Sequence, residues 1–449
     1  MKKLQLFAAC VILLLAGACS EPTATITLQV DNLEDGHKVI LTLVESDEQI
    51  KCEFDQNGLC NITLSDFSSQ YLTLSFGWQK QPLFLNPSED LSISFDIKSG
   101  FEDITFEGSA AEVNRYFISD FAKLDLRTDS KLGEAAFLAK CDSVYSANVA
   151  LMEATALPAE LKTLEKQRLI FDLYPNLTQY SLYHPYYSDE KDYTPSEVFY
   201  AKVDKIYVAD GDLYKIPGYD QFISTFVRER ATRGLSLEEQ STELLVKYID
   251  AEVTDARIAT DLIEGLVSMQ VKNSGNEGAE EILKIFKKHA TDPEVIADVE
   301  KTCATWDSIS AGNQSPEFEY LDINGNTVKL SDLRGKFVYI DVWATWCGPC
   351  RGEIPYLEKL EHAYASKDIH FVSLSVDQDK AAWEKMVTED NMGGIQIHNG
   401  GDRTFTDAYV VYGIPRFILL DRQGKIINAN MTRPSDEATA AKFDELLAK

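Results

Sequence analysis

Hydrophobic and polar residues alternate along the chain from about residue 24 to residue 108. Successive side chains of a strand point to opposite faces of a sheet, so this period of two predicts half-buried strands. The predicted strands lie in the segments TITLQV, KVILTLV, KCEFDQNGLCNITL, YLTLSF, PLFL, LSISFDI and ITFEG. Short strands separated by regular turns favour a small sandwich or barrel.

One of these segments contains a turn signal between two cysteines. Asn57-Gly58 predicts a hairpin turn, because both residues tolerate positive φ. Cys52 and Cys60 flank this turn at an even separation, so we expect their side chains on one face. A structural disulfide is the favoured interpretation, and two buried free cysteines are the alternative.

The pattern changes to a helical period between residues 110 and 311. In AAEVNRYFISDFAKL, for example, apolar residues recur every four positions. Further helices are predicted around 134–153, 158–173, 195–208, 218–232, 236–252, 255–272, 277–289 and 293–307. Cys141 and Cys303 lie on apolar stripes of two of these helices. Both should face a core, either bridged in a disulfide or as buried thiols.

The segment SAGNQSP at 310–316 has the composition of a linker, and an α/β pattern follows it. We expect a hairpin in FEYLDINGNTVKL, a buried strand in KFVYIDVWA and a helix from about Pro349 to Ser366. The α/β pattern continues with a strand in IHFVSLSV and helices near 380–390 and 403–412. It ends with strands in RFILLD and KIINANM and a helix from Ser435. The fold class is therefore multidomain, with an all-β domain at 20–109, an α-helical region at 110–311 and an α/β domain at 312–449.

The N-terminal segment predicts the location of the protein, and the net charge excludes one class of binding partner. Lys2 and Lys3 precede an apolar run from Leu4 to Leu15, which is typical of a secretory signal peptide and is shorter than a membrane span. We assign residues 1–19 to this signal and expect an exported protein. A length of 449 residues fits about three domains. The formal net charge of −29 repels nucleic acid, so we exclude nucleic-acid binding.

The motif Trp346-Cys347-Gly348-Pro349-Cys350 lies where the buried strand meets a predicted helix. The N-terminus of a helix stabilises negative charge, and the thiolate is the nucleophile in disulfide exchange. We assign Cys347 as the nucleophile and Cys350 as the resolving thiol, which together form a redox disulfide. A zinc site is the alternative, but it needs a second pair of ligands that the sequence lacks. We therefore expect neither a metal nor a cofactor.

Residues 316 to 449 resemble the thioredoxin superfamily, and specifically its TlpA and ResA-like branch of exported, membrane-tethered members. The resemblance rests on SPEFEYLDINGNTVKLSDLRGKFVYIDVWATWCGPCRGEIPYLEKL and on YGIPRFILLDRQGKI. It implies a thioredoxin-like fold for residues 312–449. The preceding two-thirds of the chain are similar to the N-terminal regions of large lipoproteins of this branch from gut-type Bacteroidetes, for which no activity is implied.

Two acidic residues match acids of the family. Asp341 corresponds to the buried acid of thioredoxin, which implies that it exchanges a proton with Cys350 through a water. An Asp held by backbone hydrogen bonds is the alternative. Ser373 takes the place of the lysine near that acid. Glu353 matches an acid near the active site of branch members, where it would raise the cysteine pKa values. A solvated helix residue is the alternative with similar weight.

The segment Gly413-Ile414-Pro415 matches the loop in which the family has a cis-proline. The resemblance implies that this loop faces the cysteines and pairs with an extended substrate, as in strand addition. Trp346 and Ile414 would then form an apolar rim. An ordinary proline at the start of an edge strand is the alternative.

The segment Leu15-Ala-Gly-Ala-Cys19 resembles a bacterial lipobox, which implies that Cys19 carries a lipid anchor; ordinary cleavage is the alternative. We therefore expect a thiol–disulfide oxidoreductase in the periplasm, anchored to the envelope membrane, that reduces protein disulfides. A membrane thiol donor would supply its electrons. An isomerase or oxidant is one alternative. Another is a binding or scaffold lipoprotein in which the redox domain has a local role.

Overall fold

The computed structural model describes residues 23–33, 37–236 and 239–448, and the predicted signal peptide and Cys19 lie outside these ranges. The chain divides into two compact units, residues 1–234 and residues 235–449. Among the described residues, no helix combines the length and the apolar character that crossing a membrane requires.

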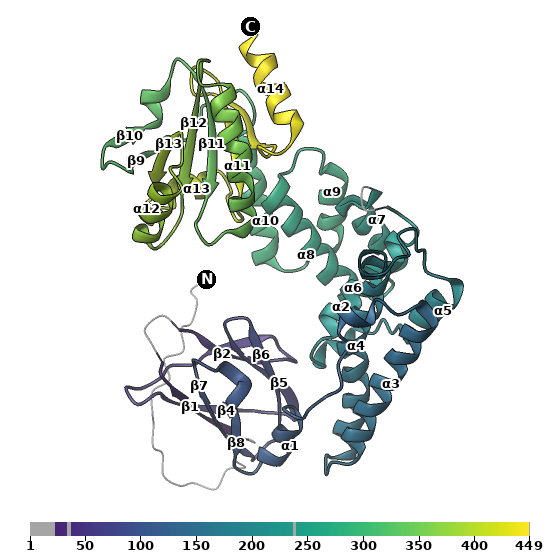
Figure 1. Ribbon diagram of the computed structural model, residues 1–449. Coiled ribbons are helices and arrows are strands. Elements are labelled where there is room, and N and C mark those ends of the chain that lie inside the picture. The colour runs from purple at the N-terminus through teal and green to yellow at the C-terminus, as the bar shows by residue number, and fades with distance from the viewer. Residues whose placement is uncertain (1–22, 34–36, 237–238, 449) are drawn as a thin grey trace. The chain divides into compact units, whose positions relative to one another are not determined.

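The first unit begins with a β-sandwich of two four-stranded sheets, whose strand orders are β4-β1-β7-β8 and β3-β2-β5-β6 (Figure 1). Buried and exposed positions alternate along β1 and β4, as predicted, and the buried side chains of both sheets form one apolar core. The strands are β1 (Thr23–Asp31), β2 (Val39–Leu43), β3 (Glu48–Lys51), β4 (Leu59–Ser65), β5 (Gln70–Phe76), β6 (Gln79–Leu85), β7 (Asp90–Asp96) and β8 (Thr105–Glu107).

The prediction of a hairpin around Asn57-Gly58 is wrong, because the strands before and after this turn belong to different sheets. Strand β3 pairs with β2, whereas β4 pairs with β1. The side chain of Asp55 closes the turn locally, since its Oδ1 accepts the backbone N–H of Asn57 at 2.8 Å and of Leu59 at 3.0 Å. A turn stabilised by its own aspartate needs no cross-strand pairing, so the chain passes from one sheet to the other.

Among the described residues of the first unit, six α-helices follow the sandwich: α1 (Ala111–Tyr116), α2 (Leu126–Asp129), α3 (Glu134–Glu153), α4 (Ala159–Tyr187), α5 (Glu197–Ile206) and α6 (Tyr219–Thr232). Helix α4 is longer than predicted and continues past Pro175. A proline inside a helix removes one hydrogen bond, but four of the residues that follow Pro175 in α4 are buried. Tyr180, for example, is fully buried and stacks on Phe137 of α3 with ring centroids 4.1 Å apart. Tertiary packing thus outweighs the local break.

The second unit begins with four helices: α7 (Thr242–Glu252), α8 (Ala256–Ser274), α9 (Glu280–His289) and α10 (Pro293–Ser308). The helices of the region predicted at 110–311 thus belong to both units. Helices α8 and α10 are close to their predicted bounds, and Asp255 and Asp292 provide N-caps by accepting backbone N–H groups.

The remainder of the second unit is a seven-stranded mixed sheet with the order β10-β9-β13-β12-β11-β14-β15. Its strands are β9 (Glu319–Asp322), β10 (Thr327–Lys329), β11 (Phe337–Trp343), β12 (Ile369–Ser375), β13 (Ile395–His398), β14 (Arg416–Leu420) and β15 (Ile426–Met431). Its helices are α11 (Gly348–Ala363), α12 (Lys380–Glu389), α13 (Thr404–Ala408) and α14 (Glu437–Leu447).

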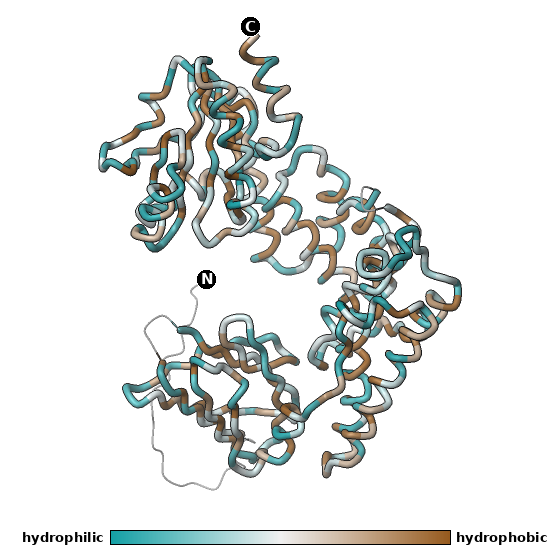
Figure 2. Tube along the Cα trace, viewed as in Figure 1, coloured by the Kyte–Doolittle hydropathy of each residue, from teal (hydrophilic) through white to brown (hydrophobic). Residues whose placement is uncertain are grey.

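The core of this sheet surrounds β11, which is buried at all seven positions. Figure 2 shows hydrophobic stretches along the central strands and more hydrophilic residues on the helices around them. Helices α11 and α14 pack on one face of the sheet through Leu357 and Phe443. The short strand β13 is absent from the prediction, since only four residues form it.

Candidate active site

The two cysteines of the motif lie at the junction of β11 and α11. Cys347 is the N-cap of α11, and its Sγ accepts the backbone N–H of Cys350 at 3.1 Å. The two sulfur atoms form a disulfide. Both cysteines are buried, whereas the preceding Trp346 is 69% exposed. The arrangement places Cys347 at the positive end of a helix, where a thiolate is stabilised.

The segment that carries Gly413, Ile414 and Pro415 lies against this disulfide. The Ile414–Pro415 peptide bond is cis. The carbonyl oxygen of Ile414 lies 3.7 Å from the Sγ of Cys347, and the Ile414 side chain packs on the same apolar cluster as both cysteines. Gly413 is exposed and Pro415 is half-buried. The structure therefore brings the predicted substrate-binding residues to the predicted nucleophile.

Asp341 is buried on β11, in the strand that leads to the motif. The register of the sheet places it opposite Ser373 of β12 and Phe417 of β14. Burial raises the pKa of its carboxyl to about 8, and the charges of Glu353 and Glu361 add to this effect. Its Oδ1 has no hydrogen-bond partner among the described residues. Asp341 is therefore not held by backbone hydrogen bonds through that oxygen, and it can exchange a proton near neutral pH.

Glu353 lies one helical turn after Cys350 and is only 8% exposed. Its carboxylate accepts the backbone N–H and the hydroxyl of Ser435, each at 3.0 Å. Arg433 lies further away, with its Nη1 3.9 Å from Oε1. The alternative of a solvated helix residue is therefore wrong. The structure instead places Glu353 where its charge acts on Asp341.

A group of polar residues that the sequence pattern did not indicate fixes Thr345, which directly precedes the motif. Asp377 is buried, and its carboxylate accepts the backbone N–H of Thr345 at 3.0 Å and the Thr345 hydroxyl at 2.7 Å. The Ser375 hydroxyl donates to the same carboxylate at 2.8 Å. The Nδ1 of His398 accepts the N–H of Gly400, so Nε2 carries the proton and donates to the carbonyl of Asp377 at 2.9 Å. The sequence signal that could have identified Asp377 is its position directly after the predicted strand IHFVSLSV.

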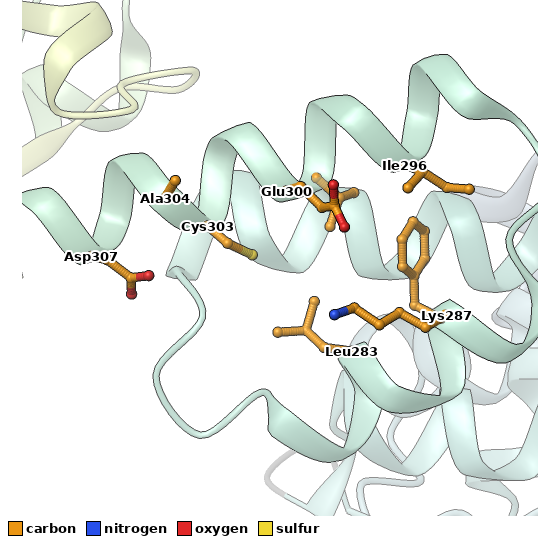
Figure 3. A pocket seen from close by; sticks show the side chains of 9 residues that line it. Leu283, Lys287, Ile296, Glu300, Cys303, Ala304 and Asp307 are labelled. Atoms are coloured by element: carbon orange, nitrogen blue, oxygen red, sulfur yellow. The ribbon is translucent and has the colours of Figure 1, made fainter.

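The four remaining described cysteines are free thiols, so the structure contains no Cys52–Cys60 bridge, contrary to the favoured interpretation. Cys52 and Cys60 are both buried in the sandwich core. Cys141 is buried in α3. Cys303 lines an open cavity of about 320 Å³ between α9 and α10, beside Leu283 and Lys287 (Figure 3).

In the part of the chain that the structure describes, no three His, Cys, Asp or Glu side chains gather around a common point. The cysteine pair of the motif is instead used up in the disulfide. The chemistry that the site offers is thiol–disulfide exchange.

Comparison with known proteins supports this chemistry. The sequence model of the Redoxin family matches residues 310–447. Thiol-disulfide oxidoreductase ResA of Bacillus thuringiensis subsp. konkukian (strain 97-27) is 31% identical over 144 residues, which cover 32% of this chain and 80% of that protein. ResA of Bacillus subtilis (strain 168) is 33% identical over 121 residues, covering 27% and 67%.

Among solved structures, a putative thiol-disulfide oxidoreductase from Bacteroides vulgatus shares 68% identity, covering 31% of this chain and 93% of that one with a TM-score of 0.29. The family match falls on the part of the chain that carries the disulfide, the cis-proline segment and the buried acid. The chain therefore belongs to the ResA-like thiol–disulfide oxidoreductases of the thioredoxin superfamily, and it is an oxidoreductase.

Proposed function

We propose that the protein reduces protein disulfides outside the cytoplasm, with Cys347 as the nucleophile and Cys350 as the resolving thiol. The observation that carries the proposal is the placement of the Cys347 Sγ at the N-cap of α11, where it accepts the N–H of Cys350. The same helix terminus would stabilise the Cys347 thiolate of the reduced enzyme.

The reaction consists of two exchanges. The Cys347 thiolate attacks a substrate disulfide, forms a mixed disulfide and releases one substrate thiolate. The Cys350 thiol then loses its proton and attacks Cys347, which releases the second substrate thiolate. The products are a reduced substrate and the Cys347–Cys350 disulfide, which is the state of the enzyme in this structure.

Asp341 is proposed as the group that accepts the Cys350 proton, through a water. A pKa of about 8 leaves about a tenth of its carboxyl groups ionised at pH 7, and this ionised form can take up a proton and return it. The unpartnered Oδ1 is available for such a water. Glu353 is proposed to tune this transfer, because its negative charge favours the protonated form of Asp341.

Substrate binding is assigned to the exposed surface on both sides of the disulfide. Trp346 would provide an apolar contact on one side, and Gly413, Ile414 and Pro415 would pair with an extended substrate segment on the other. The short distance between the Ile414 carbonyl and the Cys347 sulfur supports this assignment. A disulfide in an extended or unfolded protein segment is therefore the substrate class.

The direction of the reaction and the location of the protein rest on the sequence. The residues Gly348-Pro349 between the cysteines also occur in thioredoxin, a strong reductant with a reduction potential of about −270 mV. A reductant outside the cytoplasm needs electrons from a membrane thiol donor, and the proposed lipid on Cys19 would hold it in the periplasm near that donor.

The reduction potential of the Cys347–Cys350 couple tests the direction. The full-length chain is equilibrated in thiol buffers and alkylated. Trypsin then releases residues 337–351 as one peptide that contains both cysteines. A reduction potential of about −270 mV is expected, and a value of about −120 to −180 mV would indicate an oxidant or isomerase instead. Cys303→Ser is the matched control, because it removes a half-exposed thiol outside the motif and should leave the potential unchanged.

A further inference from the structure

Arg416, the first residue of β14, directly follows the cis peptide bond and is only 4% exposed. Within the described part of the chain, no carboxylate forms an ion pair with it. Burial lowers the pKa of its guanidinium to about 10, and no neighbouring acid offsets this effect. A buried charge without a counter-charge is costly, so an arginine here requires an explanation other than packing.

The guanidinium spans the loop that carries the substrate-binding residues. Nη1 donates to the carbonyl oxygen of Tyr409 and Nη2 to that of Val410, each at 3.5 Å. Arg416 therefore connects the two ends of the segment 409–416. Val410 has a φ of 53°, which is strained for a β-branched residue, and the segment thus depends on such contacts to hold its shape.

The same guanidinium contacts the helices that precede the sheet. Nη2 donates to the carbonyl oxygen of Asn273 in α8 at 3.4 Å, and Cζ lies 5.2 Å from the ring centroid of Trp306 in α10. Arginine stacked on tryptophan is the strongest pairing of this kind, more so when both are buried. These contacts lie within the second compact unit.

Trp306 is itself fixed in place. Its Nε1 donates to the carbonyl oxygen of Val271 at 2.7 Å. A Cβ at Gly275 would lie 3.1 Å from its ring, so the backbone of this glycine packs directly on the indole. Two further contacts join the same parts of the unit: the Nζ of Lys272 lies 5.5 Å from the Tyr412 ring, and Asn430 donates to the Asn273 carbonyl at 3.3 Å. The stacking partner of Arg416 is therefore rigid.

We propose that Arg416 is a positioning residue that fixes the 409–416 loop against α8 and α10, so that these helices form part of the substrate-binding apparatus. The proposal rests on the proposed function, because it assigns the loop to substrate. It gives the helices a role that the family match does not cover, since that match begins at residue 310. Arg416 acts through Ile414, whose carbonyl oxygen lies next to the Cys347 sulfur.

The test is the steady-state reduction of insulin by the full-length chain with Arg416→Met, Trp306→Leu and the double variant. Arg416→Met should raise KM about fivefold and leave kcat within about twofold. Trp306→Leu should have a similar effect, and the double variant should be no worse than either, because both remove one contact. Arg416→Lys, which keeps the charge but loses the planar stacking, should recover only part of the affinity.

Arg422→Met is the matched control, since Arg422, two residues after the end of β14, also stacks on an aromatic ring, with its Cζ 4.6 Å from the Phe337 centroid. An unchanged KM in Arg416→Met, the same change in Arg422→Met, or additive effects in the double variant would each overturn the proposal. Hydrogen exchange of residues 409–416 gives a second readout. It should accelerate in Arg416→Met even if insulin proves not to be reduced, an outcome that would reject the proposed function while leaving the positioning role supported.

Discussion

The sandwich and the seven-stranded sheet each bring two cysteines together, but they give the sulfur atoms different surroundings. Cys347 lies at the N-terminus of a helix, accepts an N–H and has an exposed tryptophan before it. Cys52 and Cys60 lie among aliphatic side chains between two sheets. Hydrogen bonding to Cys60 and burial raise the pKa of the Cys52 thiol.

The comparison shows that proximity alone does not make a redox centre. Exchange needs a thiolate that a substrate disulfide can reach. The helix terminus provides the stabilising dipole, and Cys347, although buried, follows the exposed Trp346 and contacts the Ile414 carbonyl of the 409–416 loop. Among the described residues, the sandwich core has no helix terminus at either sulfur, and the hydrogen bond between the two thiols shifts their pKa values in opposite directions, raising that of Cys52 and lowering that of Cys60. The two pairs should therefore respond in opposite ways to the same substitution.

The largest difference is expected when serine replaces one cysteine of each pair. Cys347→Ser removes the nucleophile and should lower the turnover of insulin disulfides by at least about a thousandfold. Cys60→Ser should leave turnover within about twofold, because Cys60 is part of the sandwich core. Both rates are measured with the full-length chain. Comparable losses in the two variants would mean that the sandwich thiols take part in the reaction.

The next effect concerns the proposed transfer of the Cys350 proton to Asp341, a step for which the sandwich has no counterpart. Asp341→Asn should slow release of the mixed disulfide about a hundredfold and spare its formation, because only release requires the Cys350 proton to leave. Stopped-flow mixing with a disulfide substrate separates the two steps. Equal rates of release in the variant and the wild type would remove Asp341 from the mechanism, and Asp332→Asn, at an exposed position, is the control.

The pH dependence of release sharpens this test. The carboxylate form of Asp341 is the proton acceptor, and its fraction grows as the pH rises through a pKa of about 8. The wild-type rate should therefore increase with pH and level off above about pH 8, an inflection that Asp341→Asn should lose. In Glu353→Gln the inflection should move to lower pH, because a negative charge beside Asp341 is gone. A fixed inflection would leave Glu353 with a structural role only.

Local signals in the sequence were sufficient for the reactive pair. The strand, the two cysteines and the helix that follows lie within one continuous segment, so the placement of Cys347 at a helix N-terminus follows from the order of residues. The alternation along β1 and the helical segments predicted at 255–272 and 293–307 are local in the same sense. Each of these predictions agrees with the structure.

Long-range contacts determined what the sequence did not reveal. Glu353 is buried because Ser435, 82 positions later, covers its carboxylate. Asp377 reaches Thr345 across 32 positions. Arg416 finds Asn273 across 143 positions. The passage from β3 to β4 likewise depends on which sheet each strand joins, and a turn motif carries no such information. Residues of this kind need the fold before their partners can be identified.

The smallest effect tests the sandwich pair as free thiols. Cys60→Ser places a hydroxyl in an apolar core and should lower the free energy of unfolding by about 1–2 kcal/mol, whereas Cys60→Ala should cost less because it buries no polar group. Urea unfolding is followed by far-UV circular dichroism in a Cys347→Ser/Cys350→Ser background, so that the disulfide of the motif does not contribute to any effect of a reductant. If the two thiols are free, dithiothreitol leaves the unfolding curve unchanged. A loss of about 2.5 kcal/mol on reduction would instead reveal a disulfide that closes the short loop between Cys52 and Cys60, since such a loop has about that entropic value in the unfolded chain.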